Sequence, residues 1–312
     1  MTSIESLLPP LKPESLQCIN RFLAYSPPKR RRRYPRRRSA AVAIILFVGR
    51  LGDLYVLLST RAGNMRTYAQ DTALPGGKYE EGDVDEEGTA RREAYEEIGL
   101  PIDHDKVRKL CLLDPFLTGN SLIVTPVILL ITDHTLSPLL NPTEVTSLFS
   151  MPLASFLHSR PSLIPSFHYT ISHRLPSAAT FESVPPPPVV GYAEDEGVVG
   201  GKEGRFYGFR DVPWGEGTVR MHRFLTGREG EGVKPVYGLT AAILIHAASI
   251  GYDQPPSFQL LAPGQKTMQE RIEWEVRNPI GTGVLRRAVE AEGLWDDWKD
   301  SSQEGVKAKA KL

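Results

Sequence analysis

Residues 76–100 read GGKYEEGDVDEEGTARREAYEEIGL and contain seven glutamates and two aspartates. No other stretch of the chain is so acidic. The pattern predicts a helix over residues 84–98, because Asp83 suits an N-cap position and Gly99 suits the turn that ends a helix. Three small or apolar residues spaced four apart would pack inward from this helix: Ala90, Ala94 and Ile98.

A second face of the predicted helix carries three carboxylates: Glu93, Glu96 and Glu97. Like charges at this spacing each cost a few tenths of a kcal/mol, so solvent, arginines or a divalent cation should offset them. Mg²⁺ and Mn²⁺ prefer carboxylate oxygens and keep water positions for substrate phosphates. The preceding Gly76 and Gly77 would let the backbone approach a metal ion or a phosphate closely. The helix alone leaves two interpretations open, a solvated acidic surface and a metal site.

Apolar runs on both sides of the acidic stretch predict β-strands. Residues 40–48 are continuously apolar, which is typical of a buried strand, and a Gly-Asp turn precedes a second strand at 54–60. Further strands are expected at 108–113 and 121–132. Helices are expected near 13–24 and at 238–250 and 266–277. Strands before and after a central helix predict the α/β class (α+β), with a mixed sheet and helices near the C-terminus.

The length of 312 residues suits one large domain with two less regular ends. Residues 1–38 form a basic N-terminal extension, in which positions 29–38, KRRRRYPRRR, carry eight basic side chains. No aromatic ladder or nucleic-acid fold motif accompanies them, so a solvated arm is expected and no stable nucleic-acid contact. The domain spans 39–280 with a flexible insertion at about 176–204, and 281–312 form a tail.

Composition narrows the class of protein further. There are 37 basic and 37 acidic residues, so the whole molecule offers no net field to a polyanionic partner. The two cysteines, Cys18 and Cys111, indicate neither a disulfide framework nor a zinc site, and a reducing compartment is expected. The longest apolar run has about nine residues, whereas a membrane span needs roughly 20. We therefore expect a soluble intracellular protein without a membrane partner.

Residues 92–100, REAYEEIGL, resemble the second half of the Nudix box and fit it at every defined position. The first half departs twice, because Asp83 replaces a glutamate and one residue is inserted. The resemblance implies a Nudix-fold α/β/α sandwich with a mixed sheet, and hydrolysis of a nucleoside diphosphate linked to another group.

The same resemblance implies roles for individual residues. Mg²⁺ or Mn²⁺ would be held by Glu93, Glu96, Glu97 and the carbonyl of Gly76. Arg92 would orient the glutamates. The general base would be Glu93 or Glu144, since Nudix enzymes often place a further carboxylate on a loop at the position of Glu144.

The residues before the box, VLLSTRAGNMRTYAQDTALPGG at 56–77, are similar to the motif of the coenzyme A diphosphatases. The matching positions are Leu57, Leu58, Thr60, Arg61, Met65, Arg66, Pro75, Gly76 and Gly77. The departures are Tyr68, Gln70, Thr72 and Leu74. The one-residue-longer box also occurs in that subfamily, and the C-terminal part resembles its fungal peroxisomal members. Coenzyme A or acyl-CoA would then be the substrate, bound by Arg61 and Arg66, and cleaved to 4′-phosphopantetheine and adenosine 3′,5′-bisphosphate.

The final tripeptide, Ala310-Lys311-Leu312, resembles a peroxisomal address, which implies the import receptor as a partner and the peroxisome as the location. The competing interpretation is a lysine- and alanine-rich tail that matches by chance. Three other functions remain open. The same glutamates could hydrolyse NADH or ADP-ribose, the domain could bind nucleotides without catalysis, or residues 29–38 could serve a nucleic-acid or decapping role.

Overall fold

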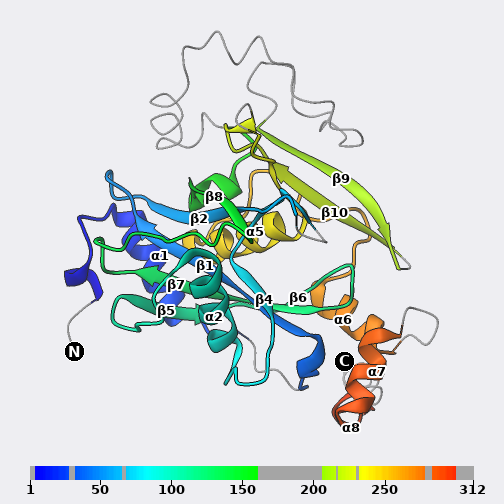
Figure 1. Ribbon diagram of the computed structural model, residues 1–312. Coiled ribbons are helices and arrows are strands. Elements are labelled where there is room, and N and C mark those ends of the chain that lie inside the picture. The colour runs from blue at the N-terminus through cyan, green and yellow to red at the C-terminus, as the bar shows by residue number, and fades with distance from the viewer. Residues whose placement is uncertain are drawn as a thin grey trace.

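The computed structural model describes residues 4–27, 32–64, 68–160, 206–215, 217–229, 232–277 and 283–299. Three predicted features lie outside these ranges: Arg66, the insertion at 176–204 and the terminal Ala310-Lys311-Leu312. The described residues form a main β-sheet covered on both faces by helices, a smaller second sheet and a group of C-terminal helices (Figure 1).

The main sheet is mixed. Its central path runs β3-β2-β1-β7-β5, while β4 also pairs with β1, β6 with β7 and β8 with β2. The β1 and β7 strands are parallel, and the other pairs are antiparallel. The bounds are β1 Ser39–Val48, β2 Leu54–Arg61, β3 Thr72–Ala73, β4 Gly76–Lys78, β5 Val107–Leu112, β6 Phe116–Leu117, β7 Ile123–Ile131 and β8 Val145–Pro152.

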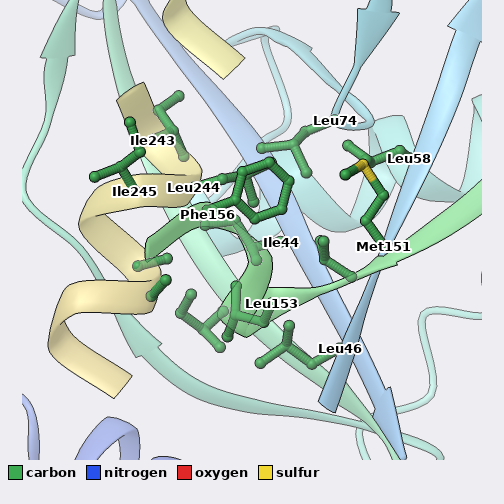
Figure 2. Close-up of a cluster of buried hydrophobic side chains, with 14 of the residues drawn as sticks. Ile44, Leu46, Leu58, Leu74, Met151, Leu153, Phe156, Ile243, Leu244 and Ile245 are labelled. Carbon is green, nitrogen blue, oxygen red and sulfur yellow. The ribbon is translucent and has the colours of Figure 1, made fainter. Parts of the chain in front are cut away.

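Helices cover both faces of this sheet because β1 is apolar on both of its faces. Successive strand residues point to opposite sides. On one side Ala41, Ala43 and Ile45 pack with α2, which spans Glu86–Ile98. On the other side Ile44 and Leu46 share a core with α1 (Pro13–Ala24), α5 (Gly238–Tyr252) and the 3₁₀ helix η3 (Leu153–Leu157). Figure 2 shows this second core, where Ile44, Leu46 and Met151 face Phe156 and the side chains of α5. The predicted α/β/α sandwich is confirmed.

The second sheet has three antiparallel strands in the order β11-β10-β9. They are β9 Tyr207–Trp214, β10 Gly217–Phe224 and β11 Val236–Tyr237. The α5 helix packs against β10 and follows β11 directly, while β11 also contacts β3 of the main sheet. This contact joins the C-terminal half of the chain to the segment that precedes the glycine pair.

The C-terminal helices are α6 (Met268–Arg277), α7 (Val284–Ala291) and α8 (Asp296–Lys299). With β6 and β7 they enclose a separate apolar cluster: Leu117, Ile123, Ile272, Val276, Leu285, Val289, Leu294 and Trp298. Among the described residues, no helix has both the length and the apolar content that crossing a membrane requires.

The described part of the basic run is partly exposed, but it contacts acidic residues of the C-terminal helices, which the sequence did not predict. Arg32 pairs with Glu273 at 2.7 Å, and Arg33 pairs with Asp297 at 2.8 Å. The Glu292 carboxylate accepts hydrogen bonds from the backbone amides of Arg36 and Arg37, at 2.8 and 2.9 Å. These two residues begin the 3₁₀ helix η2 (Arg36–Arg38), and the short helix η1 (Ile4–Leu7) lies at the other end of the N-terminal segment. Acidic C-terminal helices therefore bind the described part of the basic run.

The predicted central helix exists, but its N-cap is Asp85 rather than Asp83. The Asp85 carboxylate accepts a 2.8 Å hydrogen bond from the Gly88 amide, and α2 begins at Glu86. Gly99 ends the helix in the left-handed conformation, as predicted. The four predicted strands correspond to β1, β2, β5 and β7 and fall within two residues of the observed bounds at each end. The sequence did not predict the longer strands β8, β9 and β10, and in β8 the inward and outward residues do not alternate in polarity.

Candidate functional site

The glycine pair lies on β4, directly against the acidic helix. A Cβ atom added to Gly77 would come within 2.2 Å of the Glu93 Oε1 atom. A Cβ atom on Gly76 would come within 2.5 Å of the Ala41 carbonyl oxygen on β1. Backbone atoms of β1 leave room only for glycine at Gly76, whereas at Gly77 an added Cβ would meet only the Glu93 side chain. The absence of a Cβ atom at Gly77 therefore lets the Glu93 carboxylate lie against the strand backbone.

Strand pairing turns the backbone groups of Gly76 toward the helix. Ala43 donates a 2.8 Å hydrogen bond to the Pro75 carbonyl, and Tyr79 donates a 3.0 Å hydrogen bond to the Ser39 carbonyl. Because hydrogen-bonded pairs alternate along an antiparallel ladder, Gly76 opposite Val42 is a non-hydrogen-bonded pair. Its N–H and C=O groups therefore point away from β1, and the N–H donates to the Glu97 carboxylate.

Glu97 is a buried carboxylate beside one arginine of the described chain. Its side chain is only 7% exposed, and Nη1 of Arg61 lies 3.8 Å from its Oε1. Burial raises the pKa of Glu97 to about 8; Arg61 and the Gly76 amide oppose this shift, whereas the charges of Glu93 and Glu144 add to it. Burial also raises the pKa of Glu93. Both shifts come mainly from burial, which disfavours the ionised carboxylates, so a bound cation would help to keep them ionised.

Arg92 orients the carboxylates around it. Its Nε donates to Asp83 at 3.0 Å and its Nη1 donates to Glu93 at 3.0 Å and to Glu96 at 3.1 Å. Its Nη2 bonds the Lys78 carbonyl at 3.0 Å and the second Asp83 oxygen at 3.2 Å. One guanidinium thus links the helix to the end of β4. The bonds to these carboxylates raise the pKa of Arg92, so it stays charged.

Asp83 stands where the Nudix box has a glutamate. Its carboxylate binds Arg92. It also accepts hydrogen bonds from the Glu80 amide at 2.9 Å and from Thr89 Oγ1 at 2.8 Å. Burial raises the pKa of Asp83, but these bonds outweigh it and hold the pKa below its usual value. A shorter carboxylate at this position therefore still anchors Arg92.

Glu144 and Arg61 reach the site from neighbouring strands. Glu144 is half-buried just before β8, and its carbonyl accepts a 2.7 Å hydrogen bond from the amide of Ala62. Arg61 ends β2 next to a β-bulge. Its Nε is buried and has no hydrogen-bond partner in the described part of the chain. An unsatisfied buried donor beside the carboxylates suits an anionic ligand.

The donor set suits a hard divalent cation, because it consists of carboxylate and peptide oxygens. Within the described ranges, however, no three His, Cys, Asp or Glu side chains are grouped closely enough to hold a metal ion by themselves. Glu96, which the sequence grouped with Glu93 and Glu97, is 49% exposed and bonds Arg92.

The structure also brings in a group that the sequence did not single out. The Asp71 carboxylate, on the loop after Arg61, accepts hydrogen bonds from Lys234 and from the hydroxyl of Tyr237. Lys234 lies 163 positions away in the chain, so no local pattern could have indicated this contact.

Comparison with known proteins agrees with the site. The model of the NUDIX domain matches residues 36–171. Nudix hydrolase 15 of Arabidopsis thaliana, a mitochondrial protein, is 35% identical over 70% of this chain and 60% of its own length. Peroxisomal coenzyme A diphosphatase 1 of Saccharomyces cerevisiae is 34% identical over 45% of this chain and 49% of its own. The Nudix hydrolase NudL of Photorhabdus laumondii is 34% identical over 48% of this chain and 75% of its own.

The chain spans about 60% of the length of the first two curated relatives that it matches. The matched region contains both the main sheet and the acidic helix. The family match, the α/β/α sandwich and the glycine pair against the glutamate helix together show that this chain belongs to the Nudix hydrolase family.

Proposed function

We propose that the protein hydrolyses the pyrophosphate bond of coenzyme A or its derivatives, giving 4′-phosphopantetheine and adenosine 3′,5′-bisphosphate. One observation carries the proposal. Arg61 belongs to the coenzyme A-type motif, and its guanidinium lies 3.8 Å from Glu97 of the Nudix box. This closeness supports taking the two motifs as parts of one site. The likeness to a protein named a coenzyme A diphosphatase supports the same substrate.

The proposed roles follow from the contacts. Glu93, Glu97 and the Gly76 carbonyl would hold Mg²⁺ or Mn²⁺, with Glu96 as a further ligand if it leaves Arg92. When bound, the cation supplies positive charge that offsets both the carboxylates and the substrate pyrophosphate.

The remaining steps belong to the protein's own side chains. Arg61 would bind the anionic substrate through its unsatisfied Nε and its terminal amino groups. Arg92 would keep Glu93 and Glu96 oriented. Glu93 or Glu144 would accept the proton of the attacking water. The Gly77 position would hold the Glu93 carboxylate close to the strand. A role for Arg66 in phosphate binding stays part of the proposal.

The proposed location is the peroxisome, with the import receptor as a partner of Ala310-Lys311-Leu312. The names of the relatives give different locations: the yeast relative is named as peroxisomal and the Arabidopsis relative as mitochondrial. A fluorescent fusion with and without the last three residues tests the address. Peroxisomal signal that persists without the tripeptide would exclude it.

The function is tested by turnover of coenzyme A, acetyl-CoA, NADH, ADP-ribose and a capped RNA with Mg²⁺ or Mn²⁺, with products identified by mass. We expect adenosine 3′,5′-bisphosphate from coenzyme A, with slower turnover of NADH, ADP-ribose and the RNA. Preferential cleavage of NADH or ADP-ribose would reject the coenzyme A assignment and leave the metal site standing. No turnover together with tight nucleotide binding would indicate a binding module without catalysis.

Two variants of the same helix separate catalysis from stability. Glu97→Gln removes the carboxylate beside Gly76 and should lower kcat by about a thousandfold, the scale of losing one charge-stabilising group. Glu87→Gln is the control, since Glu87 is a similarly buried carboxylate that pairs with Arg91 and Lys109 on another face. The control should lose stability but keep Mn²⁺ binding and kcat. Wild-type kcat in Glu97→Gln would reject this site.

A further inference from the structure

The loop between β2 and β3 is tied to the second sheet through one buried carboxylate. Asp71 is 8% exposed, and it accepts a 2.8 Å hydrogen bond from Lys234 Nζ and another from the Tyr237 hydroxyl. Lys234 Nζ also donates to the Ala69 carbonyl at 2.9 Å. Thr72 Oγ1 donates to the Lys234 carbonyl at 2.5 Å. Four contacts therefore hold one end of the loop against the segment that leads into and forms β11.

The loop held by these contacts has a strained backbone. Tyr68 and Gln70 adopt left-handed conformations, with φ of 57° and 62°. Positive φ is uncommon for residues other than glycine, and for a bulky residue it is an outlier. Such conformations persist where surrounding contacts hold them, and they cluster at ligand-binding sites. The strain therefore points to a loop whose shape matters.

A continuous series of contacts runs from Asp71 to the catalytic carboxylates. The Arg61 amide donates to the Asp71 carbonyl at 3.0 Å, and the Gln70 amide donates to the Arg61 carbonyl at 3.1 Å. The Arg61 side chain then lies 3.8 Å from Glu97. The Arg61 backbone is thus bonded on one side to the Gln70–Asp71 segment, while β2 pairs with β8 on the other side. Asp71 in turn is bonded by Lys234 and Tyr237.

We propose that Lys234 and Tyr237 are positioning residues for substrate recognition. The bonds of Lys234 and Tyr237 to Asp71 form a contact that we call the clamp. The clamp holds the strained loop so that Arg61 meets the anionic part of a nucleoside diphosphate derivative. Neither residue needs to touch the substrate. This inference rests on the proposed function, because it takes Arg61 as a substrate-binding group.

The test compares Lys234→Met and Tyr237→Phe with a matched control. Lys12→Met breaks a similar Lys–Asp pair, since Lys12 Nζ lies 2.8 Å from Asp53 with exposed fractions of 32% and 15%. The exposed fractions of the side chains alone are 43% for Lys234 and 12% for Asp71. We expect each clamp variant to raise KM for coenzyme A about tenfold with kcat within about twofold, the effect of losing roughly one charge-assisted hydrogen bond. Lys12→Met should leave KM unchanged, and Lys234→Arg should restore a value near wild type.

A double-mutant comparison separates positioning from general destabilisation. If the clamp acts through Arg61, Lys234→Met should add little to the KM of Arg61→Ala, since mutations in one chain of contacts are not additive. A further tenfold rise in the Arg61→Ala background would overturn the proposal. An equal KM change in Lys12→Met would also overturn it.

Hydrogen exchange gives a readout that needs no turnover. Amides of the segment around Arg61 and Gln70 should exchange about tenfold faster in the Lys234→Met, Tyr237→Phe double variant than in wild type, because local opening becomes easier, but not in Lys12→Met. Unchanged exchange would reject the clamp whatever the substrate. If wild type cleaves another nucleoside diphosphate derivative, the coenzyme A assignment fails, and KM for that substrate tests the clamp.

Discussion

Replacing Gly77 by alanine should damage catalysis far more than folding. The new Cβ would lie 2.2 Å from Glu93 Oε1, whereas ordinary contacts begin near 3.4 Å, so the carboxylate oxygen must move by about 1.2 Å. The atom that moves is the end of a flexible side chain, so the strand itself need not shift. The displaced Glu93 loses its 3.0 Å bond to Arg92.

The effects on stability and on catalysis should differ in size. Losing a partly exposed ion pair costs about 0–1 kcal/mol. A Gly→Ala change that the native backbone tolerates stabilises by roughly 0.4–1 kcal/mol, because it restricts the unfolded chain, so the unfolding free energy should stay within about 1 kcal/mol of wild type. A misplacement of about 1 Å in a catalytic group costs on the order of 100-fold in rate. We therefore expect kcat to fall about 100-fold with little change in Tm.

The assay measures kcat on the best substrate of the panel alongside urea unfolding. Gly88→Ala is the matched control, because Gly88 lies inside α2 and its added Cβ would meet Asp85 Oδ1 at an ordinary 3.6 Å. That control should gain up to about 1 kcal/mol of stability and keep its kcat. A Gly77→Ala enzyme with wild-type kcat would refute the reasoning that Glu93 must lie against this strand.

Three further predictions concern other parts of the molecule. Asp85→Ala removes the observed N-cap of α2 and should cost about 1 kcal/mol in urea unfolding; no loss would mean that the cap bond to Gly88 contributes nothing. Arg92→Lys cannot form the two-pronged contact with Asp83, so kcat should fall about 10- to 100-fold in steady-state assays; unchanged kcat would show that any cation suffices. Burial lowers the pKa of His222 from 6.5 to about 4. As the pH falls, His222 is therefore protonated in the unfolded chain before it is protonated in the folded protein. Stability should be complete above pH 6.5 and fall by about 3 kcal/mol as the pH decreases to 4, and His222→Gln should remove that part of the dependence in urea melts at several pH values.

The acidic helix could be recognised from the sequence because its signals are local. Residues three and four positions apart share a helix face whatever surrounds the helix, so Glu93 and Glu97 could be placed together on α2. The Ala90, Ala94 and Ile98 stripe predicted which side is buried, and all three are fully buried. The long apolar strands were equally visible, because a strand buried on both faces needs a continuous apolar run.

Other features depended on residues far apart in the chain. Asp83 and Asp85 are both good caps, and the choice fell to Asp85 because Arg92 and Thr89 bind Asp83. The basic arm is bound because α6–α8 bring Glu273, Asp297 and Glu292 to it. No sequence pattern shows which distant carboxylate an arginine will find.

The sequence by itself determined that a glycine pair, an arginine and a row of glutamates follow one another along a strand and a helix. Only the tertiary structure decided which other groups reach them. In the folded chain Arg61 lies near Glu97, and Glu144, just before β8, lies close enough to affect the pKa of Glu97. Asp71 is bonded to Lys234, which is 163 positions away in the sequence. The physical reason is that helix and turn signals act over a few residues, whereas burial and ion pairing depend on how strands and helices pack.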